Sequence, residues 1–282
     1  MKESRELEHR EQWREVGGTP GLGFVDAGPA NAPAVVLLHS LGTDHSLWQP
    51  QIASLARAHR VLAPDTRGHG RSGWAQPATV GSWVTDLIRV LDEAACDQAV
   101  LVGVSMGGIQ ALATAAEHPT RVRGVVAADT FARLAPDDAQ AKTRALVDLA
   151  RAAGMNALAD HYVQTTFTVS PLPAVAEHVR SAIAGMSFAA YEATARAVFG
   201  IELEDRLPFV GCPVQVLWGE RDAKAPRELS ARIVAAVPDA TLTVVPGAGH
   251  LSNAETPGFF TAQVERFAES LNEEVTPYGQ QA

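Results

Sequence analysis

The chain has 282 residues, 46% of them hydrophobic, and a formal net charge of −9 at pH 7. This length and composition fit one large globular α/β domain. The acidic balance, without a basic run, argues against nucleic acid and anionic membrane surfaces as partners. The charged N-terminal segment lacks the apolar core of a signal peptide, and no stretch approaches the roughly 20 apolar residues of a membrane span. We therefore expect a cytoplasmic protein.

The first 13 residues are charged and weakly patterned, as in a frayed helix or a disordered tail. A hairpin is expected next, because segments 14–16 and 22–26 flank a turn rich in glycine. Short apolar runs then alternate with longer amphipathic stretches. The expected strands are 34–38, 60–63, 99–104, 125–128, 214–218 and 241–245. The expected helices are 47–57, 80–94, 106–118, 227–237 and 257–271. This alternation predicts a mostly parallel, doubly wound α/β sheet.

The alternation stops between about residues 132 and 206, where only helical patterns occur. Helices are expected from 137 to a stop at Gly154, over 156–166 and 175–186, and from the N-cap Ser187 to Gly200. We interpret residues 132–206 as a helical cap inserted after the sixth strand. Residues 1–131 and 207–282 then form the α/β core, and the cap lies over the carboxyl ends of its strands, where such sheets bind ligands.

The two cysteines, Cys96 and Cys212, are far apart in the sequence, and no zinc-ligand spacing is present. This pattern predicts two buried free thiols and no metal site.

The strongest local motif is Gly103-Val104-Ser105-Met106-Gly107, which joins the strand 99–104 to the helix 106–118. A Gly-x-Ser-x-Gly sequence in that context is typical of a nucleophile elbow, a sharp turn from strand to helix. Small residues two positions before and after the serine keep such a turn free of collisions. The motif therefore predicts Ser105 as a catalytic nucleophile.

A serine hydroxyl needs a general base to attack at neutral pH. Of the nine histidines, His250 is the best placed, because it lies in a glycine-rich loop between the last strand and the last helix. His69 also follows a strand and is a rival, but we expect no carboxylate from a third loop to orient it. His39 is expected to shape the loop after the strand 34–38.

The acid that orients the base should follow a strand between the serine and the histidine. Asp222 fits this place, directly after the strand 214–218. Glu220 is too near the strand end, and Asp129, after the strand 125–128, is the alternative. The sequence thus predicts the order Ser105, Asp222, His250.

An oxyanion hole needs two backbone N–H donors. We expect one from Met106, which follows the nucleophile, and the other from Leu41, in the loop after the strand 34–38.

In this order and spacing, the four motifs resemble the α/β-hydrolase superfamily from about residue 22 to residue 271. The segments 40–44, 65–70, 152–155 and 249–255 are also similar to 3-oxoadipate enol-lactonases of aromatic catabolism. The resemblance implies an α/β-hydrolase fold and a triad of Ser105, Asp222 and His250. The chain departs from these lactonases in the loop 222–226, which lacks their usual threonine before the proline.

The substrate of such lactonases is a small lactone that carries a carboxylate, and a cationic residue commonly follows the strand expected here at 125–128. The resemblance therefore implies that Arg133 binds the carboxylate. Other cap arginines are alternatives: Arg144, Arg151, Arg180 and Arg196. Tyr191 is a candidate for the wall of the substrate pocket.

These observations predict a hydrolase of small carboxylic esters or lactones that forms an acyl-serine and needs no cofactor. The first candidate substrate is 3-oxoadipate enol-lactone. The alternatives are a general carboxylesterase, a cofactor-free perhydrolase or haloperoxidase with the same three residues, and a ligand receptor with slow turnover. A dehalogenase is excluded, because that chemistry requires a carboxylate in place of Ser105.

Overall fold

The computed structural model describes residues 11–273, so the charged N-terminal segment lies largely outside the described residues. Within that range the centre is an eight-stranded sheet in the order β1-β2-β4-β3-β5-β6-β7-β8. β2 is antiparallel to β1 and to β4, and the other neighbours are parallel. The strands are β1 (Gln12–Val16), β2 (Leu22–Ala27), β3 (Ala34–Leu38), β4 (Arg60–Pro64), β5 (Ala99–Val104), β6 (Val122–Ala128), β7 (Val214–Gly219) and β8 (Ala240–Val245). The predicted hairpin and mostly parallel sheet are confirmed.

The largest difference among the strands is at β6, which begins before the predicted residue 125. Arg123 and Gly124 interrupt the apolar run there, but the backbone already pairs with β5. Gly124 also lies close to α9, because a Cβ at this position would be 2.7 Å from Leu271. A side chain at this position would displace Leu271 or Phe267, so glycine is favoured there and interrupts the apolar pattern of the strand.

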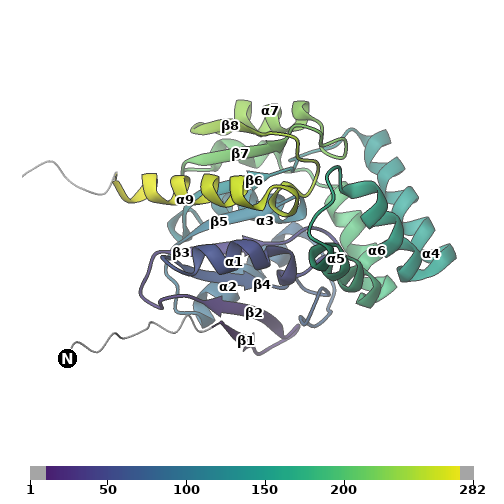
Figure 1. Ribbon diagram of the computed structural model, residues 1–282, viewed down its shortest axis with the longest axis horizontal. Coiled ribbons are helices and arrows are strands. Elements are labelled where there is room, and N and C mark those ends of the chain that lie inside the picture. Colours follow the sequence, from purple (N-terminus) through teal and green to yellow (C-terminus); the bar gives the residue numbers. More distant parts are fainter. Residues whose placement is uncertain (1–10, 274–282) are drawn as a thin grey trace, which may run out of the picture.

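Helices cover both faces of the sheet (Figure 1). α1 and α9 pack on one face, and α2, α3 and α7 pack on the other. The predicted helix at 47–57 divides into a 3-10 turn, His45–Trp48, and a short α-helix that has Pro50 in its first turn, where proline is tolerated. The bounds are α1 (Gln49–Leu55), α2 (Val80–Glu93), α3 (Met106–Glu117), α7 (Arg227–Ala236) and α9 (Pro257–Glu273).

Three helices between β6 and β7 gather at one end of the sheet (Figure 1) and are called the cap helices below. They are α4 (Pro136–Thr166), α5 (Pro173–Gly185) and α6 (Phe188–Phe199). Gly154 has φ +85° and ψ 169°, a non-helical conformation that divides α4 into two parts, as its sequence predicted. The Ser187 side chain accepts a hydrogen bond from Ala190 N–H and caps α6.

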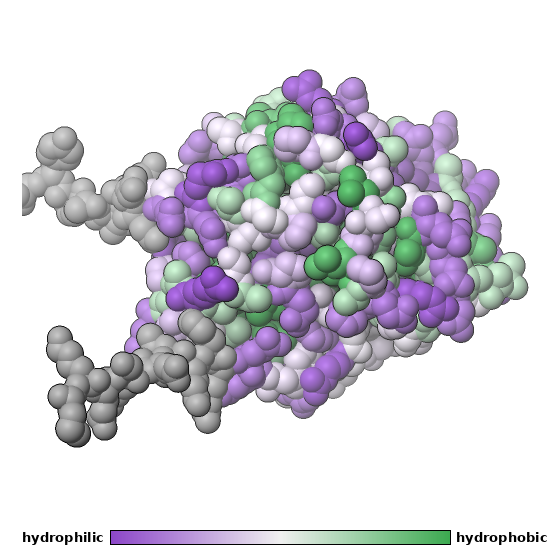
Figure 2. Space-filling view, viewed as in Figure 1, coloured by the Kyte–Doolittle hydropathy of each residue, from purple (hydrophilic) through white to green (hydrophobic). Residues whose placement is uncertain are grey.

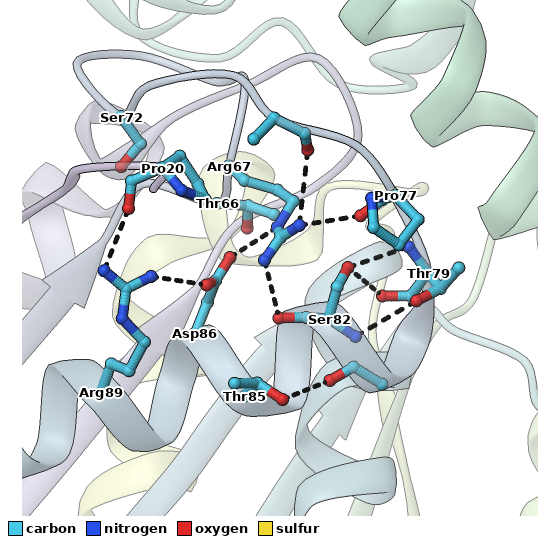
Figure 3. Close-up of polar contacts among 12 residues, drawn as sticks. Pro20, Thr66, Arg67, Ser72, Pro77, Thr79, Ser82, Thr85, Asp86 and Arg89 are labelled. Carbon is cyan, nitrogen blue, oxygen red and sulfur yellow. Dashed lines mark hydrogen bonds and ion pairs between the residues drawn. The ribbon is translucent and has the colours of Figure 1, made fainter. Parts of the chain in front are cut away.

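A buried ion pair fixes the loop between β4 and α2 (Figure 3). Arg67 Nε donates to Asp86 Oδ2 over 2.6 Å, and Arg89 donates to the other carboxylate oxygen over 3.0 Å. The Arg67 guanidinium also donates to the carbonyls of Pro77 and Ser82. The loop that carries His69 is thereby held against α2.

Among the described residues, no helix combines the length and the apolar character needed to cross a membrane. On the face drawn in Figure 2, hydrophobic residues lie scattered among hydrophilic ones. Cys96 and Cys212 are both buried and free, which confirms the prediction for the thiols.

Candidate active site

Ser105 lies on a sharp turn between β5 and α3, in the rare backbone conformation φ +56°, ψ −116°. Such a conformation in a non-glycine residue costs about 1–3 kcal/mol and persists only where the surroundings enforce it. Here Ser105 N–H donates to Ala128 O over 2.8 Å, and the Thr130 hydroxyl donates to Ser105 O over 2.6 Å. Strand β6 and the residues after it thus hold the turn in place.

Both glycines of the motif are required by close backbone contacts. A Cβ at Gly103 would lie 2.1 Å from the carbonyl carbon and oxygen of Gly107, and a Cβ at Gly107 would lie 2.0 Å from Leu38 O. No larger residue fits at either place without moving β3 or α3. The local geometry is that of a nucleophile elbow.

Ser105, His250 and Asp222 form a chain of two hydrogen bonds. His250 Nε2 is 3.0 Å from Ser105 Oγ, and His250 Nδ1 is 2.9 Å from Asp222 Oδ2. Since a carboxylate only accepts, Nδ1–H donates to Asp222, and Nε2 is left to accept from the serine hydroxyl. All three residues are buried. This arrangement is able to remove the hydroxyl proton as the serine oxygen attacks a carbonyl carbon.

The Asp222 carboxylate is fixed by its own loop. Its Oδ1 accepts hydrogen bonds from Lys224 N–H over 2.8 Å and Ala225 N–H over 3.0 Å. The oxygen that faces His250 therefore has a defined direction. Glu220 instead accepts a hydrogen bond from Gly247 N–H over 2.8 Å.

The rival residues have other partners. His69 Nδ1 donates to Arg67 O over 3.2 Å, and burial together with the nearby His39 lowers the pKa of His69 to about 3. Asp129 accepts hydrogen bonds from Gly219 N–H and Ser252 N–H. Burial, reinforced by the charge of Asp222, raises the pKa of Asp129 well above its usual value.

The two expected oxyanion donors belong to residues near Ser105: Met106 follows it in the chain, and Leu41 lines the same cavity. Met106 is the first residue of α3, where N–H groups have no partner within the helix. Leu41 follows β3, in a loop braced by His39, whose Nδ1–H donates to Ser40 O and whose Nε2 accepts from Thr66 N–H. Burial lowers the pKa of His39, in keeping with this neutral form.

A cavity of about 170 Å³ opens beside Ser105 and His250. Most of its wall is apolar, and the side chains of the cap helices supply much of it. Tyr162 also lines it, with its hydroxyl 3.3 Å from Ser40 Oγ, and burial raises the pKa of Tyr162 to about 12. The apolar wall consists of Leu41, Phe131, Ala145, Leu146, Val198 and Phe199.

Arg133 is not in this cavity wall, contrary to the expectation that it binds substrate. Its guanidinium is 3.0 Å from Glu202 and 3.9 Å from Glu204, and 44% of its side chain is exposed. The Arg133 guanidinium is thus paired with acidic residues that follow α6. The other arginine candidates also lie outside the cavity wall, and three are paired on the surface: Arg151 and Arg196 with Glu192, and Arg180 with Asp160.

Tyr191 is not in the cavity wall either. It is buried behind the loop after β3, where a Cβ at Gly42 would lie 3.5 Å from the Tyr191 ring. The cavity wall instead contains two cations that the sequence did not single out, Lys142 of α4 and Lys224 of the loop after β7. Lys224 stands two residues after Asp222, and this position beside the predicted acid is the one sequence signal that could have identified it.

Among the described residues, one group has the geometry to hold a metal ion: Asp44, His45 and Asp65. It lies outside the cavity wall, and its members already bond within the chain. His45 Nδ1 is 2.8 Å from Asp65 Oδ1, and Asp44 caps the turn that follows it.

A comparison with models of protein families matches residues 35–264 to the alpha/beta hydrolase family. The chain belongs to the alpha/beta hydrolase family. The predicted fold class and superfamily are therefore confirmed, together with the enzyme class, a hydrolase of ester bonds.

Several named relatives of this family member are similar over almost their whole length. 3-oxoadipate enol-lactonase 2 of Acinetobacter baylyi is 31% identical, over 89% of this chain and 94% of the relative. The crystal structure of the enol-lactonase from Burkholderia xenovorans LB400 superimposes with a TM-score of 0.82 at 30% identity, covering 92% of this chain and all of that one. The structure of a thermophilic esterase from Thermogutta terrifontis superimposes with a TM-score of 0.80 at 28% identity, covering 92% of this chain and 99% of that one.

Proposed function

We propose that the protein is a serine hydrolase that cleaves a small carboxylic ester or lactone through an acyl-serine intermediate. The observation that carries this proposal is the hydrogen-bond chain from Ser105 through His250 to Asp222, at the wall of an apolar cavity. Residues 132–206 act in this proposal as a cap domain on the core, because their helices line the cavity over Ser105.

In the first half-reaction, Ser105 Oγ attacks the carbonyl carbon while His250 Nε2 takes the hydroxyl proton. The carbonyl oxygen becomes an oxyanion, which the Leu41 and Met106 amides stabilise; each such donor contributes roughly 10²–10³ in rate. Collapse of the adduct breaks the bond to the ester oxygen, and His250 protonates that oxygen. Asp222 stabilises the imidazolium that exists between these two proton transfers.

In the second half-reaction, His250 takes a proton from water as the water oxygen attacks the acyl-serine. The bond between the acyl carbon and Ser105 Oγ then breaks, His250 returns the proton to Oγ, and a carboxylic acid is released. For a lactone, both products of ring opening are parts of one molecule. Water is the only co-reactant, so no cofactor is needed.

The first substrate to test is 3-oxoadipate enol-lactone. This choice is supported by the similarity to the Acinetobacter and Burkholderia enol-lactonases over nearly the whole chain. We also assign the enzyme to the cytoplasm and to aromatic catabolism as part of this proposal. The two buried free thiols, Cys96 and Cys212, suit a reducing compartment.

Covalent labelling tests the role of Ser105. A fluorophosphonate should modify the native protein, and mass spectrometry of its peptides should place the label on Ser105. The variants Ser105→Ala and His250→Ala should not be labelled, and the native protein should turn over 4-nitrophenyl acetate many times. Absence of both label and turnover would contradict the proposal and would favour a ligand receptor instead.

A further inference from the structure

Lysine is rare in this chain, and two of its lysines line one cavity. Lysine and arginine together number 23, and the only lysines in the sequence are Lys2, Lys142 and Lys224. Lys2 lies outside the described residues. The other two, from α4 and from the loop after β7, line the same cavity as Ser105 and His250.

The two lysines are held close together. Lys142 Nζ donates a hydrogen bond to Lys224 O over 3.1 Å, and Lys224 Nζ lies 4.9 Å from the centre of the Tyr162 ring. Within the described part of the chain, neither ammonium forms an ion pair with a carboxylate. Asp222 is the nearby acid, but its oxygens bind His250 and two backbone N–H groups.

Two cations without a paired anion are costly in a partly buried, mostly apolar wall. Burial and the neighbouring Lys142 charge lower the pKa of Lys224 to about 8, although Asp222 opposes the change. A bound anion would offset both the cost of burying the two ammonium groups and the repulsion between them, because it attracts both positive charges. The protein as a whole is acidic, so this positive pair stands out from its surroundings.

We propose that Lys142 and Lys224 form an anion-binding pair that positions a free carboxylate of the substrate while Ser105 attacks its ester or lactone group. The preferred substrate is then an ester or lactone of a small dicarboxylic acid. This inference rests on the proposed function, and it gives to two lysines the task that the sequence suggested for Arg133. Lysine suits this task, because its flexible stem lets a compact charge follow a small ligand.

The test compares two esters of one acyl length: 4-nitrophenyl hydrogen glutarate, which carries a free carboxylate, and its neutral methyl ester. For the native enzyme at about pH 7, kcat/KM should favour the anionic ester. A hydrogen bond to a charged group is worth about 1.5–3 kcal/mol, so Lys224→Met should reduce the ratio of the two kcat/KM values roughly 10- to 100-fold. Lys142→Met should reduce the same ratio.

Lys224→Arg keeps the charge and should retain most of the preference, and Arg133→Ala should leave the ratio unchanged. Circular dichroism and thermal unfolding establish that each variant is folded. A native enzyme without preference for the anionic ester overturns the inference. So does a Lys224→Met variant that keeps the native ratio.

A binding measurement separates this inference from the proposed function. Calorimetry with adipate, which has no ester to cleave, should detect binding to the native protein and to Ser105→Ala, and much weaker binding to the Lys142→Met/Lys224→Met variant. If neither ester is cleaved but adipate binds in this way, the proposed function fails and the anion site stands. If esters are cleaved but adipate binds equally to the lysine variant, the anion site fails.

Discussion

Asp129 accepts a hydrogen bond of 3.0 Å from the backbone N–H of Ser252, two residues after His250. The other oxygen of Asp129 accepts from Gly219 N–H over 2.8 Å, at the end of the strand that leads to Asp222. One buried carboxyl group therefore connects the two loops that carry the proposed base and acid. Its role is to position them, since His250 Nδ1–H donates its hydrogen bond to Asp222 and not to Asp129.

The variant Asp129→Ala should lower both stability and activity. It leaves two buried N–H groups without an acceptor, at a cost of about 1–3 kcal/mol each. Thermal unfolding should show the loss of stability, and kcat should fall because the two loops shift relative to Ser105. If kcat falls to the level of Asp222→Ala while the melting temperature stays native, Asp129 is the orienting acid and our assignment of Asp222 is wrong.

The elbow glycines give a stability prediction with an internal control. Gly103→Ala brings a Cβ to 2.1 Å from the Gly107 carbonyl, so the backbone around Ser105 must move. We expect a loss of several kcal/mol and of ester hydrolysis, as for other severe backbone clashes. The control is Gly81→Ala in α2, where nothing lies within 4 Å of the new Cβ. That variant should be as stable as the native protein or more stable, since alanine is the better helix former. Equal denaturant midpoints for both variants would contradict the geometry.

The elbow and the hydrogen-bond chain of Ser105, Asp222 and His250 could be predicted from the sequence, because they depend on local spacing and on the strand order of one sheet. The motif around Ser105 lies within five consecutive residues, and Asp222 and His250 lie in the loops that follow β7 and β8. The carboxyl ends of neighbouring parallel strands meet at one edge, so these side chains come together without detailed packing.

The substrate-binding residues could not be predicted in this way. Lys142 and Lys224 are 82 positions apart and meet only through the docking of α4 on the loop after β7. Arg133 is only two residues after Phe131 of the cavity wall, but its guanidinium forms ion pairs with Glu202 and Glu204, which follow the cap helices in the sequence. Tertiary contacts between distant segments decide which cation faces the ligand, and these contacts cannot be predicted from the hydrophobic periodicity of the sequence.

The acidity of Lys224 predicts how hydrolysis of an anionic ester depends on pH. The ammonium is charged below its pKa of about 8 and neutral above it, so carboxylate binding weakens as pH rises through that value. Lys142, Asp222, Tyr162 and His250 are the other titratable groups near it, and Tyr162, with a pKa of about 12, stays neutral in this range.

For 4-nitrophenyl hydrogen glutarate, kcat/KM should therefore fall as the pH rises above about 8, since kcat/KM reports the free enzyme. The neutral methyl ester should lack this fall. In Lys224→Arg the fall should vanish, because arginine keeps its charge. Parallel profiles for the two esters would contradict a role for the Lys224 charge in binding the substrate carboxylate.

Removing one partner of the buried pair of Arg67 and Asp86 should lower the free energy of unfolding more than removing both. Asp86→Ala leaves a buried guanidinium without its carboxylate, and breaking such a pair costs about 3–5 kcal/mol. The double variant Arg67→Met/Asp86→Leu removes both charges and should be more stable than Asp86→Ala alone. Urea unfolding of the three proteins measures this; a double variant less stable than Asp86→Ala would show that the carbonyl contacts of Arg67 outweigh the ion pair.

Ser105 is the proposed nucleophile of an ester or lactone hydrolase. The most direct measurement follows loss of 3-oxoadipate enol-lactone by ultraviolet absorbance, with 4-nitrophenyl acetate alongside, for the native enzyme and Ser105→Ala. We predict rapid opening of the lactone, slower cleavage of the ester, and a loss of roughly 10⁴–10⁶ in kcat for both in the variant. Native rates in Ser105→Ala would contradict the claim, whereas cleavage of the ester alone would keep Ser105 and remove the lactone as substrate.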